Sequence, residues 1–402
     1  MSSPKINFDK DLDENFIFLQ SAIESKKIIR ITTVPISLKY LLKGQMHFMS
    51  KNGFDVIMIS ADGEEVKDIV DDEQCKHKII PLTRKITPIK DLYSLMKLYK
   101  FLKKERPLIV HTHTPKAGTI GMLASYLAKV PIRLHTVAGL PLLESKGLKR
   151  MILNFVENIT YKCSTKVYPN SFGLKEIILK NKFAETNKVK VIANGSSNGI
   201  DTSYFNPELF SKQEKQNLKI NLKIEKDDFV FIFVGRVVGD KGINELIEAF
   251  NELSIEIKKI KLLIVGPFEK ELNPLQKKTK LLINNNDKII LVGYQNDVRP
   301  YFAISNTLVF PSYREGFPNV VMQASAMGLP SIVSDINGCN EIIENNVNGI
   351  IITVKDTNAI YNSMKKIYYD KDLFKDVKSK SRNAIKKKYE REVYWGLLLN
   401  EY

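Results

Sequence analysis

The residues best suited to chemistry lie in the loop 312–318, between two short apolar runs at 308–310 and 331–333. Two such runs separated by one small-residue helix are typical of a parallel strand–helix–strand unit. Ligands gather at the carboxyl ends of strands in parallel sheets, so the loop should face a crevice. Glu315, an open glycine and the amides of a helix that begins at Pro318 would suit a polyhydroxylated, phosphorylated ligand. Taken alone, the loop also fits an ordinary surface turn.

A second cluster of functional residue types follows the buried run 229–234. Gly235 would let a ligand approach the backbone there. Arg236 and Lys241 would place two positive charges beside the start of the next helix, where a diphosphate also gains amide donors. One arginine and one lysine are common in any loop, so a solvated surface loop is the alternative at this point.

Histidines mark the end of the apolar run 107–110. His111 and His113 are two residues apart, so on a strand they would share a face. Together with His135 they make a zinc site conceivable, but no acidic or cysteine ligand keeps the required spacing. We expect His113 to take a polar role in a cleft and His111 to be structural.

Composition and length restrict the class of protein. The chain has 402 residues, is 44% hydrophobic and 26% charged, and carries a formal charge of +16. This length favours two domains, and the charge favours polyanionic partners, namely nucleic acid, an anionic membrane or phosphorylated substrates. The three scattered cysteines, Cys75, Cys163 and Cys339, indicate reduced thiols and a cytoplasmic location. No signal peptide is evident, and no apolar run approaches the ~20 residues of a spanning helix.

Alternating strands and helices predict an α/β protein made of two doubly wound domains that face a central cleft. The expected strands are 27–33, 54–60, 107–110, 166–171 and 189–192 in the first half, then 229–234, 261–265, 289–294, 308–310, 331–333 and 348–352. Helices are expected at 40–52 and 91–104. The expected parts are an extension at 1–26, a first domain at 27–205, a linker at 206–228, a second domain at 229–380, and a C-terminal helix at 381–402 that packs back toward the first domain.

The apolar segment 136–143 precedes a helix with basic flanks at 146–162. Two interpretations are open. Its apolar residues either pack inside, or Leu140, Leu142 and Leu143 enter a membrane interface while nearby lysines meet phosphates. Lys43 and Lys116 are the other residues that we assign to the acceptor and membrane side.

Several motifs together resemble the retaining glycosyltransferase family 4. They are Gly235-Arg236 with Asp240-Lys241-Gly242, the turn Val265-Gly266, the loop 314–318, and Asn-Gly-Ile-Asp at 198–201. Residues 111–118 and 136–140 resemble a bacterial branch that builds capsule, O-antigen or protein-linked glycans on polyprenyl diphosphate. The resemblance covers about residues 27–395.

The resemblance implies the GT-B fold, with two Rossmann-like domains and a nucleotide-sugar donor held mainly by the second. Arg236 and Lys241 would hold the donor diphosphate and stabilise the leaving group, while Glu315 would bind hydroxyls of the donor sugar. His113 would lie near the reacting sugar. The resemblance implies further donor contacts from Gly235 and from the amides of Gly316 and Phe317, ahead of Pro318. The backbone of Val292, Gly293 and Tyr294 would contact the nucleotide base.

One position departs from the family's pattern. A second glutamate, eight residues after the first, normally binds the ribose hydroxyls, and this chain has Gln323 there. A neutral amide can still bond a diol, but it lacks the charge-assisted bond. The departure affects the ribose contact and leaves the predicted fold unchanged.

The expected reaction is transfer of a hexose or N-acetylhexosamine from a nucleotide sugar, with UDP preferred over GDP, to a polyprenyl-diphosphate-linked saccharide. The resemblance implies retention of configuration. No carboxylate pair of the double-displacement type is evident. No Asp-x-Asp motif follows a strand, so we expect neither a metal nor another cofactor. The enzyme is expected to be peripheral at the inner face of the plasma membrane, against its anionic surface.

Three alternatives stay open at this stage. A nucleotide-sugar 2-epimerase shares the two-domain fold, but the set Arg236, Lys241 and Glu315 argues against it. A nucleic-acid-binding protein would explain the charge, but the lysines are scattered and no recognition motif is visible. A non-catalytic sugar-nucleotide-binding partner subunit is suggested by Gln323.

Overall fold

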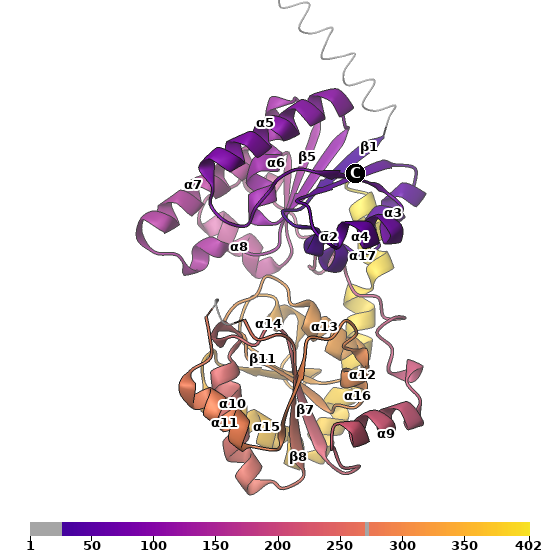
Figure 1. The fold of residues 1–402 in the computed structure, drawn as a ribbon, viewed down its shortest axis with the longest axis vertical. Coiled ribbons are helices and arrows are strands. Elements are labelled where there is room, and N and C mark those ends of the chain that lie inside the picture. The colour runs from indigo at the N-terminus through magenta and orange to yellow at the C-terminus, as the bar shows by residue number, and fades with distance from the viewer. Residues whose placement is uncertain (1–25, 270–272) are drawn as a thin grey trace, which may run out of the picture. The chain divides into compact units, whose positions relative to one another are not determined.

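The computed structural model describes residues 26–269 and 273–402, apart from the side chains at 143 and 144. The predicted extension 1–26 therefore lies outside the described residues except for Lys26. The chain divides into two compact units, Met1–Asn198 with Tyr394–Tyr402, and Gly199–Val393. Figure 1 shows the elements of each unit. The predicted linker 206–228 contains a short turn, η3 (Pro207–Leu209), and a helix, α9 (Lys212–Asn221), both within the second unit.

The first unit is built on a parallel six-stranded sheet of order β3-β2-β1-β4-β5-β6. Its strands are β1 (Lys27–Ile31), β2 (Asp55–Ser60), β3 (Lys76–Ile79), β4 (Ile109–His113), β5 (Ile132–Val137) and β6 (Lys166–Pro169). Its helices are α2 (Pro35–Leu41), α3 (Gln45–Lys51), α4 (Val66–Glu73), α5 (Pro88–Glu105), α6 (Pro115–Leu127), α7 (Gly147–Cys163) and α8 (Phe172–Lys180), with turns η1 (Pro141–Glu144) and η2 (Thr186–Lys188).

Both faces of this sheet are covered, as the apolar runs require. Alternate side chains of a strand point to opposite faces, and β1 shows the consequence. Ile29 and Ile31 pack in one core with residues of α5 and α6. Ile28 packs in another with residues of α2, α3 and α4 and with Tyr394 and Leu398 of the last helix, α17 (Arg391–Leu399). The chain therefore returns to the first unit for its last nine residues.

The second unit repeats the same topology. Its parallel sheet has the order β12-β11-β10-β7-β8-β9. The strands are β7 (Phe229–Val234), β8 (Ile260–Val265), β9 (Ile289–Gly293), β10 (Thr307–Phe310), β11 (Ser331–Ser334) and β12 (Gly349–Ile352). The helices are α10 (Ile243–Glu256), α11 (Lys277–Asn285), α12 (Arg299–Ala303), α13 (Asn319–Ala326), α14 (Cys339–Ile342), α15 (Thr357–Tyr369) and α16 (Lys371–Tyr389), and the turn η4 (Gly239–Lys241) precedes α10.

Each sheet reverses its winding direction between its first and fourth strands. In the first unit this point lies between β1 and β4, and in the second between β7 and β10. The loops that leave two such strands part in opposite directions, which leaves a crevice at the carboxyl ends. The loops predicted to do chemistry follow β7 and β10, and His113 ends β4.

The structure differs from the prediction in three places. The helix predicted at 40–52 is two helices, because Gly44 has φ +81° and the Glu73 carboxylate accepts hydrogen bonds from the Gly44 and His47 amides at the start of α3. Residues 189–192 form only an isolated bridge through Val189 rather than a strand. The strand β3 was not predicted; it is polar and mostly exposed at the sheet edge, so it lacks the apolar run of a central strand.

The apolar loop after β5 faces inward. Leu140 and Leu142 are buried in a core with Val137, Tyr161 and residues of α8. Their assignment to a membrane interface is therefore wrong, because their apolar surface is already covered by protein. The side chain of Leu143 lies outside the described part of the structure. Among the described residues, no helix combines the length and the apolar character needed to cross a bilayer.

Candidate active site

The candidate site in the second unit lies at the carboxyl ends of β7 and β10. Gly235 directly follows β7 and donates a backbone hydrogen bond to the Val265 carbonyl in β8. The chain then turns through η4 into α10 at Gly242, whose φ is +71°. A Cβ on Gly242 would lie 2.1 Å from the Pro311 carbonyl oxygen. Glycine is therefore required where the loop after β7 presses against the loop after β10.

An ion pair joins these two loops. The Lys241 ammonium donates to the Glu315 carboxylate, and the Ser312 hydroxyl donates to the same oxygen at 2.9 Å. Both charged side chains are about 15% exposed, so solvent reaches them only in part. Burial and the nearby Glu315 charge raise the pKa of the Cys339 thiol well above its usual value. Lys241 and Glu315, predicted from separate motifs, are thus brought together in a confined environment.

The loop that carries Glu315 is held from two further sides. Arg314 pairs with Asp240 at 2.9 Å, and the Tyr313 hydroxyl donates to Glu245 of α10 at 2.6 Å. The Tyr313 amide also donates to the Asp240 carbonyl at 2.9 Å. These bonds fix the loop against η4 and α10, so the position of Glu315 is set by packing rather than by its own flexible side chain.

Arg236 lies in the same loop system but is more open. Its guanidinium pairs with Glu269 at 2.8 Å, and the two side chains are 43% and 32% exposed. An ion pair this exposed is worth little, on the order of 0–1 kcal/mol. Arg236 can therefore exchange Glu269 for a stronger anionic ligand at small cost. Sequence reasoning missed Glu269, because nothing in a strand-end loop distinguishes one glutamate from another.

Backbone donors adjoin the ion pair. The amides of Gly316 and Phe317 donate no hydrogen bond within the described chain, and they precede α13 directly. Asn337 holds this segment by donating to the carbonyls of Glu315 and Gly316 at 3.2 and 2.9 Å. Free amides at a helix start attract an anion. Pro318 is the cap residue before α13 rather than its first helical residue, one position from its predicted place.

The other predicted donor contacts lie nearby in the fold. Gln323 is on α13, half-buried, and its side chain makes no hydrogen bond within the described residues. Val292 and Gly293 end β9, and the Gly293 carbonyl accepts from Gly266 at 2.8 Å. Tyr294 follows with 58% of its surface exposed. The Phe317 side chain is buried against Tyr389 at a ring distance of 5.4 Å.

The histidines of the first unit form a buried polar cluster. His113 is 1% exposed, stacks on His111 at 4.4 Å, and has no partner for either ring nitrogen within the described residues. His111 is fully engaged, with Thr136 at 2.8 Å on one nitrogen and the Tyr402 hydroxyl at 2.6 Å on the other. Burial, and next the positive charge of Arg30, hold the pKa of both histidines well below its usual range.

Arg30 organises this cluster and was not predicted. Its guanidinium donates to Gln45 and to the Tyr402 hydroxyl, and lies 3.1 Å from Nδ1 of His111. Burial lowers the pKa of Arg30 to about 9. A charged residue inside the apolar run 27–31 could have indicated this cluster. Its bond to Tyr402 could not be foreseen, because the two residues are far apart in the sequence.

The chain is strained directly after His113. Thr114 has φ +73° and ψ 146°, an unfavourable combination for a threonine. Its hydroxyl shares hydrogen bonds with the amide and hydroxyl of Thr33, at 3.2 and 2.7 Å. These bonds join the ends of β1 and β4, where the winding reverses. Backbone strain that surrounding bonds maintain is concentrated at functional sites.

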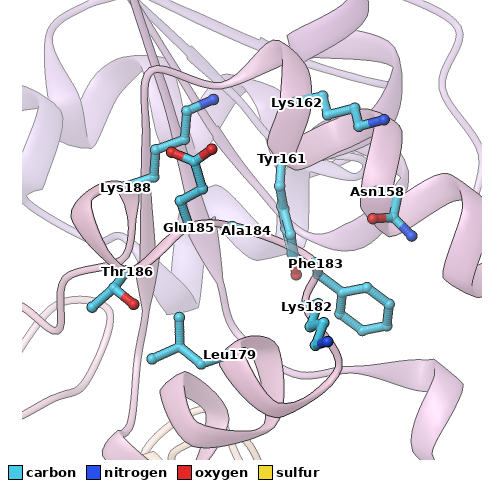
Figure 2. A pocket seen from close by; sticks show the side chains of 10 residues that line it. All are labelled: Asn158, Tyr161, Lys162, Leu179, Lys182, Phe183, Ala184, Glu185, Thr186 and Lys188. Atoms are coloured by element: carbon cyan, nitrogen blue, oxygen red, sulfur yellow. The ribbon is translucent and has the colours of Figure 1, made fainter.

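The two predicted acceptor-side lysines do not lie together. Lys116 lies in the first turn of α6 and pairs with Asp91 of α5. Lys43 is exposed near α3, 3.9 Å from Asp72. Elsewhere in the first unit, a pocket of about 430 Å³ is lined by the end of α7, the end of α8 and the segment through η2. Figure 2 shows that its lysine side chains do not converge on one point. No predicted site residue lines it.

Comparison with known proteins identifies the family to which both units belong. The model of "Glycosyl transferases group 1" matches residues 214–389, and that of "Glycosyl transferase 4-like" matches residues 34–171. The chain is 34% identical to a capsular polysaccharide biosynthesis glycosyltransferase, CapM, of Staphylococcus aureus, over 94% of this chain and 97% of the relative.

Two further comparisons agree with this match. The chain is 31% identical to UDP-Gal:alpha-D-GlcNAc-diphosphoundecaprenol alpha-1,3-galactosyltransferase of Escherichia coli, over 91% of this chain and 94% of the relative. Its fold is similar to that of Anabaena Alr3699/HepE in complex with UDP and glucose, with a TM-score of 0.80 and 15% identity, over 93% of this chain and 98% of that one.

Proposed function

Because this chain belongs to glycosyltransferase family 4 and has the GT-B fold, we propose that it transfers a hexose or N-acetylhexosamine from a UDP-linked donor to a polyprenyl-diphosphate-linked saccharide. The names of the S. aureus and E. coli relatives support this substrate class, since they refer to capsular polysaccharide and to a diphosphoundecaprenol acceptor. The enzyme would work in surface polysaccharide or glycan assembly, at the inner face of the plasma membrane.

One observation carries the proposal. Lys241, Arg236 and Glu315 lie at the carboxyl ends of β7 and β10, beside free amides at the start of α13. Two cations and two amides can neutralise a diphosphate, and a held carboxylate can accept hydrogen bonds from sugar hydroxyls. In the free chain Glu315 and Glu269 engage the two cations. Donor binding would replace these partners with the diphosphate.

We propose a retaining reaction that needs no metal ion. The bond between the anomeric carbon and the diphosphate oxygen breaks, and the acceptor oxygen bonds to the same face of that carbon. The acceptor's proton passes to the departing diphosphate. Arg236 and Lys241 stabilise the charge that develops there, and this preorganised charge would do what a metal ion does elsewhere.

His113 would contact the reacting sugar as a neutral imidazole. Its lowered pKa keeps it uncharged at neutral pH, so it can accept or donate a hydrogen bond without adding a buried charge. Its two unpaired ring nitrogens are an uncommon feature, since buried polar atoms are nearly always hydrogen-bonded. A sugar hydroxyl would satisfy one of them.

Donor binding is the first test. Thermal shifts would be measured with UDP-, GDP- and ADP-sugars, each with magnesium and with a chelator. We expect a shift with a UDP-sugar in both conditions, reduced in Arg236→Ala and Lys241→Ala. Lys278→Ala is the control, because Lys278 is an exposed lysine of the same unit, paired with Glu248 on the surface. Equal shifts in all variants would contradict the assignment of the diphosphate site.

Turnover is the second test. Glu315→Ala should lower kcat by about 10²–10³-fold, the usual effect of losing one preorganised polar contact. Gln323→Glu should lower KM for the donor if the residue contacts the ribose. Products formed from donor alone, without an acceptor, would favour a 2-epimerase instead. Donor binding without transfer to any lipid-linked acceptor would favour the non-catalytic partner subunit.

A further inference from the structure

Two helices of the first unit expose rows of large apolar side chains. On α5 the row is Ile89, Leu92, Tyr93 and Met96, and on α7 it is Leu148, Met151, Ile152 and Phe155. Each row follows the spacing i, i+3, i+4, i+7, which defines one face of a helix. Every member is at least 45% exposed, and Ile89 reaches 87%. Scattered exposed apolar residues are normal, but contiguous apolar patches mark interaction sites.

Both rows lie toward the carboxyl ends of the strands of the first sheet, the end at which His113 lies. The helices α5 and α7 start from the carboxyl edge of the sheet, and the rows occupy their first halves. Between them lies α6, which contacts both (Figure 1). The ion pair from Lys116 to Asp91 joins the starts of α6 and α5. The two rows and the end of β4 thus belong to one region of the first unit.

The charge around the rows has one sign. On α5, α6 and α7 the acidic residues are Asp91, Glu105 and Glu157. The first two are paired with Lys116 and Lys27, and Glu157 is buried. The basic residues of the two outer helices are Lys90, Lys97, Lys100, Lys103 and Lys104 on α5, and Lys149, Arg150 and Lys162 on α7. On the opposite face of the sheet, α4 carries the exposed acidic residues Asp68, Asp71 and Asp72.

We propose that the rows on α5 and α7, with their lysines, form a face that docks on an anionic lipid bilayer. This inference rests on the proposed function, because a lipid-linked acceptor must be reached from a membrane surface. Apolar side chains of such helices enter the boundary between headgroups and acyl chains, while lysines meet lipid phosphates. This face replaces the loop at Leu140 and Leu142, which the structure shows to be buried.

The charge favours a bilayer over a second copy of the chain as the occupant. The basic side chains beside the rows are Lys90 and Lys97 on α5 and Lys149 and Arg150 on α7. Because each acidic residue of these helices is paired or buried, they would repel a second copy of the same face. An acidic bilayer satisfies all of them at once without a fixed geometry. The face also places the bilayer near the end of β4, where His113 would meet the acceptor.

Vesicle flotation of the full chain tests the proposal directly. Wild type should float with vesicles of phosphatidylglycerol and cardiolipin, and not with phosphatidylcholine. The pairs Ile89→Ser with Tyr93→Ser on α5, and Met151→Ser with Phe155→Ser on α7, should each weaken partition at least about tenfold. Lys90→Glu with Lys149→Glu tests the charge. Ile255→Ser is the control, since Ile255 is 71% exposed on α10 of the second unit.

Activity separates docking from the chemistry itself. The docking variants should lose transfer to a long-chain polyprenyl-diphosphate acceptor in vesicles, but keep transfer to a short-chain acceptor in detergent-free buffer. Their thermal shifts with a UDP-sugar should equal that of wild type, which also confirms folding. If no acceptor supports transfer by wild type, the proposed function fails while flotation still decides the docking face.

Three outcomes would overturn the proposal. Wild type could fail to float with anionic vesicles, or the docking variants could float as well as the Ile255→Ser control. Third, wild type could sediment as a dimer and fail to bind vesicles, while the docking variants sediment as monomers. That result would assign the face to a second copy of the chain.

Discussion

At the residue scale, the first unit buries its polar groups as a connected set. Arg30, His111 and Tyr402 bond to one another, and His113 stacks on the set without a partner. Buried polar networks are costly unless they are satisfied. Within the described residues, Nε of Arg30 also lacks a partner, but His113 is the member of this set with no hydrogen bond on any side-chain nitrogen. His113 is therefore the member expected to meet a ligand.

Acidification should destabilise the first unit through His135. Burial lowers the pKa of His135 to about 4. In the unfolded chain this histidine binds a proton near pH 6.5. The stability that the neutral, buried His135 contributes is therefore fully present above that pH and is lost as the pH falls toward 4. Between pH 6.5 and 5, protonation of His135 in the unfolded chain lowers the free energy of unfolding by about 2 kcal/mol.

The measurement is urea unfolding at several pH values, followed by the fluorescence of Trp395. This residue is the chain's single tryptophan and lies in the first unit. In His135→Asn the free energy of unfolding should depend less steeply on pH. Burial raises the pKa of Glu73 and Glu157, so these two groups make the folded chain more stable as the pH falls, opposite to His135. The comparison is therefore between the slopes of unfolding free energy against pH in the variant and in wild type. Equal slopes would contradict the prediction.

Tyr402→Phe should loosen the polar cluster. The substitution removes the hydroxyl that Arg30 and His111 both contact, and leaves a buried cation with one partner fewer. The expected cost is about 1–2 kcal/mol, which corresponds to amide hydrogen exchange about 5–30-fold faster in β1 and β4. Tyr126→Phe, an exposed tyrosine of the same unit, is the control and should change nothing.

At the element scale, the site depends on turns that only glycine permits. Gly242 combines a left-handed conformation with a close approach to Pro311. Together they allow the loops after β7 and β10 to touch, which brings Lys241 to Glu315. The motif Asp240-Lys241-Gly242 therefore encodes a backbone contact as well as a charge.

Gly242→Ala should disrupt the proposed donor site. Left-handed strain contributes about 1–2 kcal/mol and the clash about 1–3 kcal/mol more. Gly328→Ala separates the two effects, because Gly328 has φ +81° but no atom lies within 4 Å of the added Cβ. We expect the thermal shift with a UDP-sugar to fall in the first variant and to persist in the second. Loss of binding in both variants would instead implicate general destabilisation.

At the scale of the whole molecule, two units with the same strand order are built on one chain that returns to its first unit. Tyr394 and Leu398 are buried in the core of the first unit, and the Trp395 indole donates to Asn198 at 2.6 Å. The last nine residues are therefore a structural part of a unit whose other residues lie about 200 positions earlier.

Deletion of 394–402 should destabilise only the first unit. Removing two buried side chains costs at least about 3 kcal/mol in typical cores. Hydrogen exchange should accelerate in β1 to β6 and stay unchanged in β7 to β12. Tyr369→Ala, an exposed aromatic change in the second unit, is the control. Equal acceleration in both sheets would show that the two units unfold together.

The sequence by itself determined the class of the fold and the loops that carry most residues of the candidate site. Apolar runs of strand length are local, so the strands β7 to β12 could be predicted. The loops with Arg236, Lys241 and Glu315 follow β7 and β10 directly. The edge strand β3 and the break at Gly44 could not, because neither produces an apolar pattern.

Only the tertiary structure decided which residues meet. The strand order places β7 beside β10 and β1 beside β4, and no local pattern specifies that order. It therefore decided that Lys241 pairs with Glu315, that Arg30 and Tyr402 bond beside His111, and that Leu140 is buried while Phe155 is exposed. Burial and pairing depend on residues distant in sequence, which is why composition and spacing identified the residue types but not their partners.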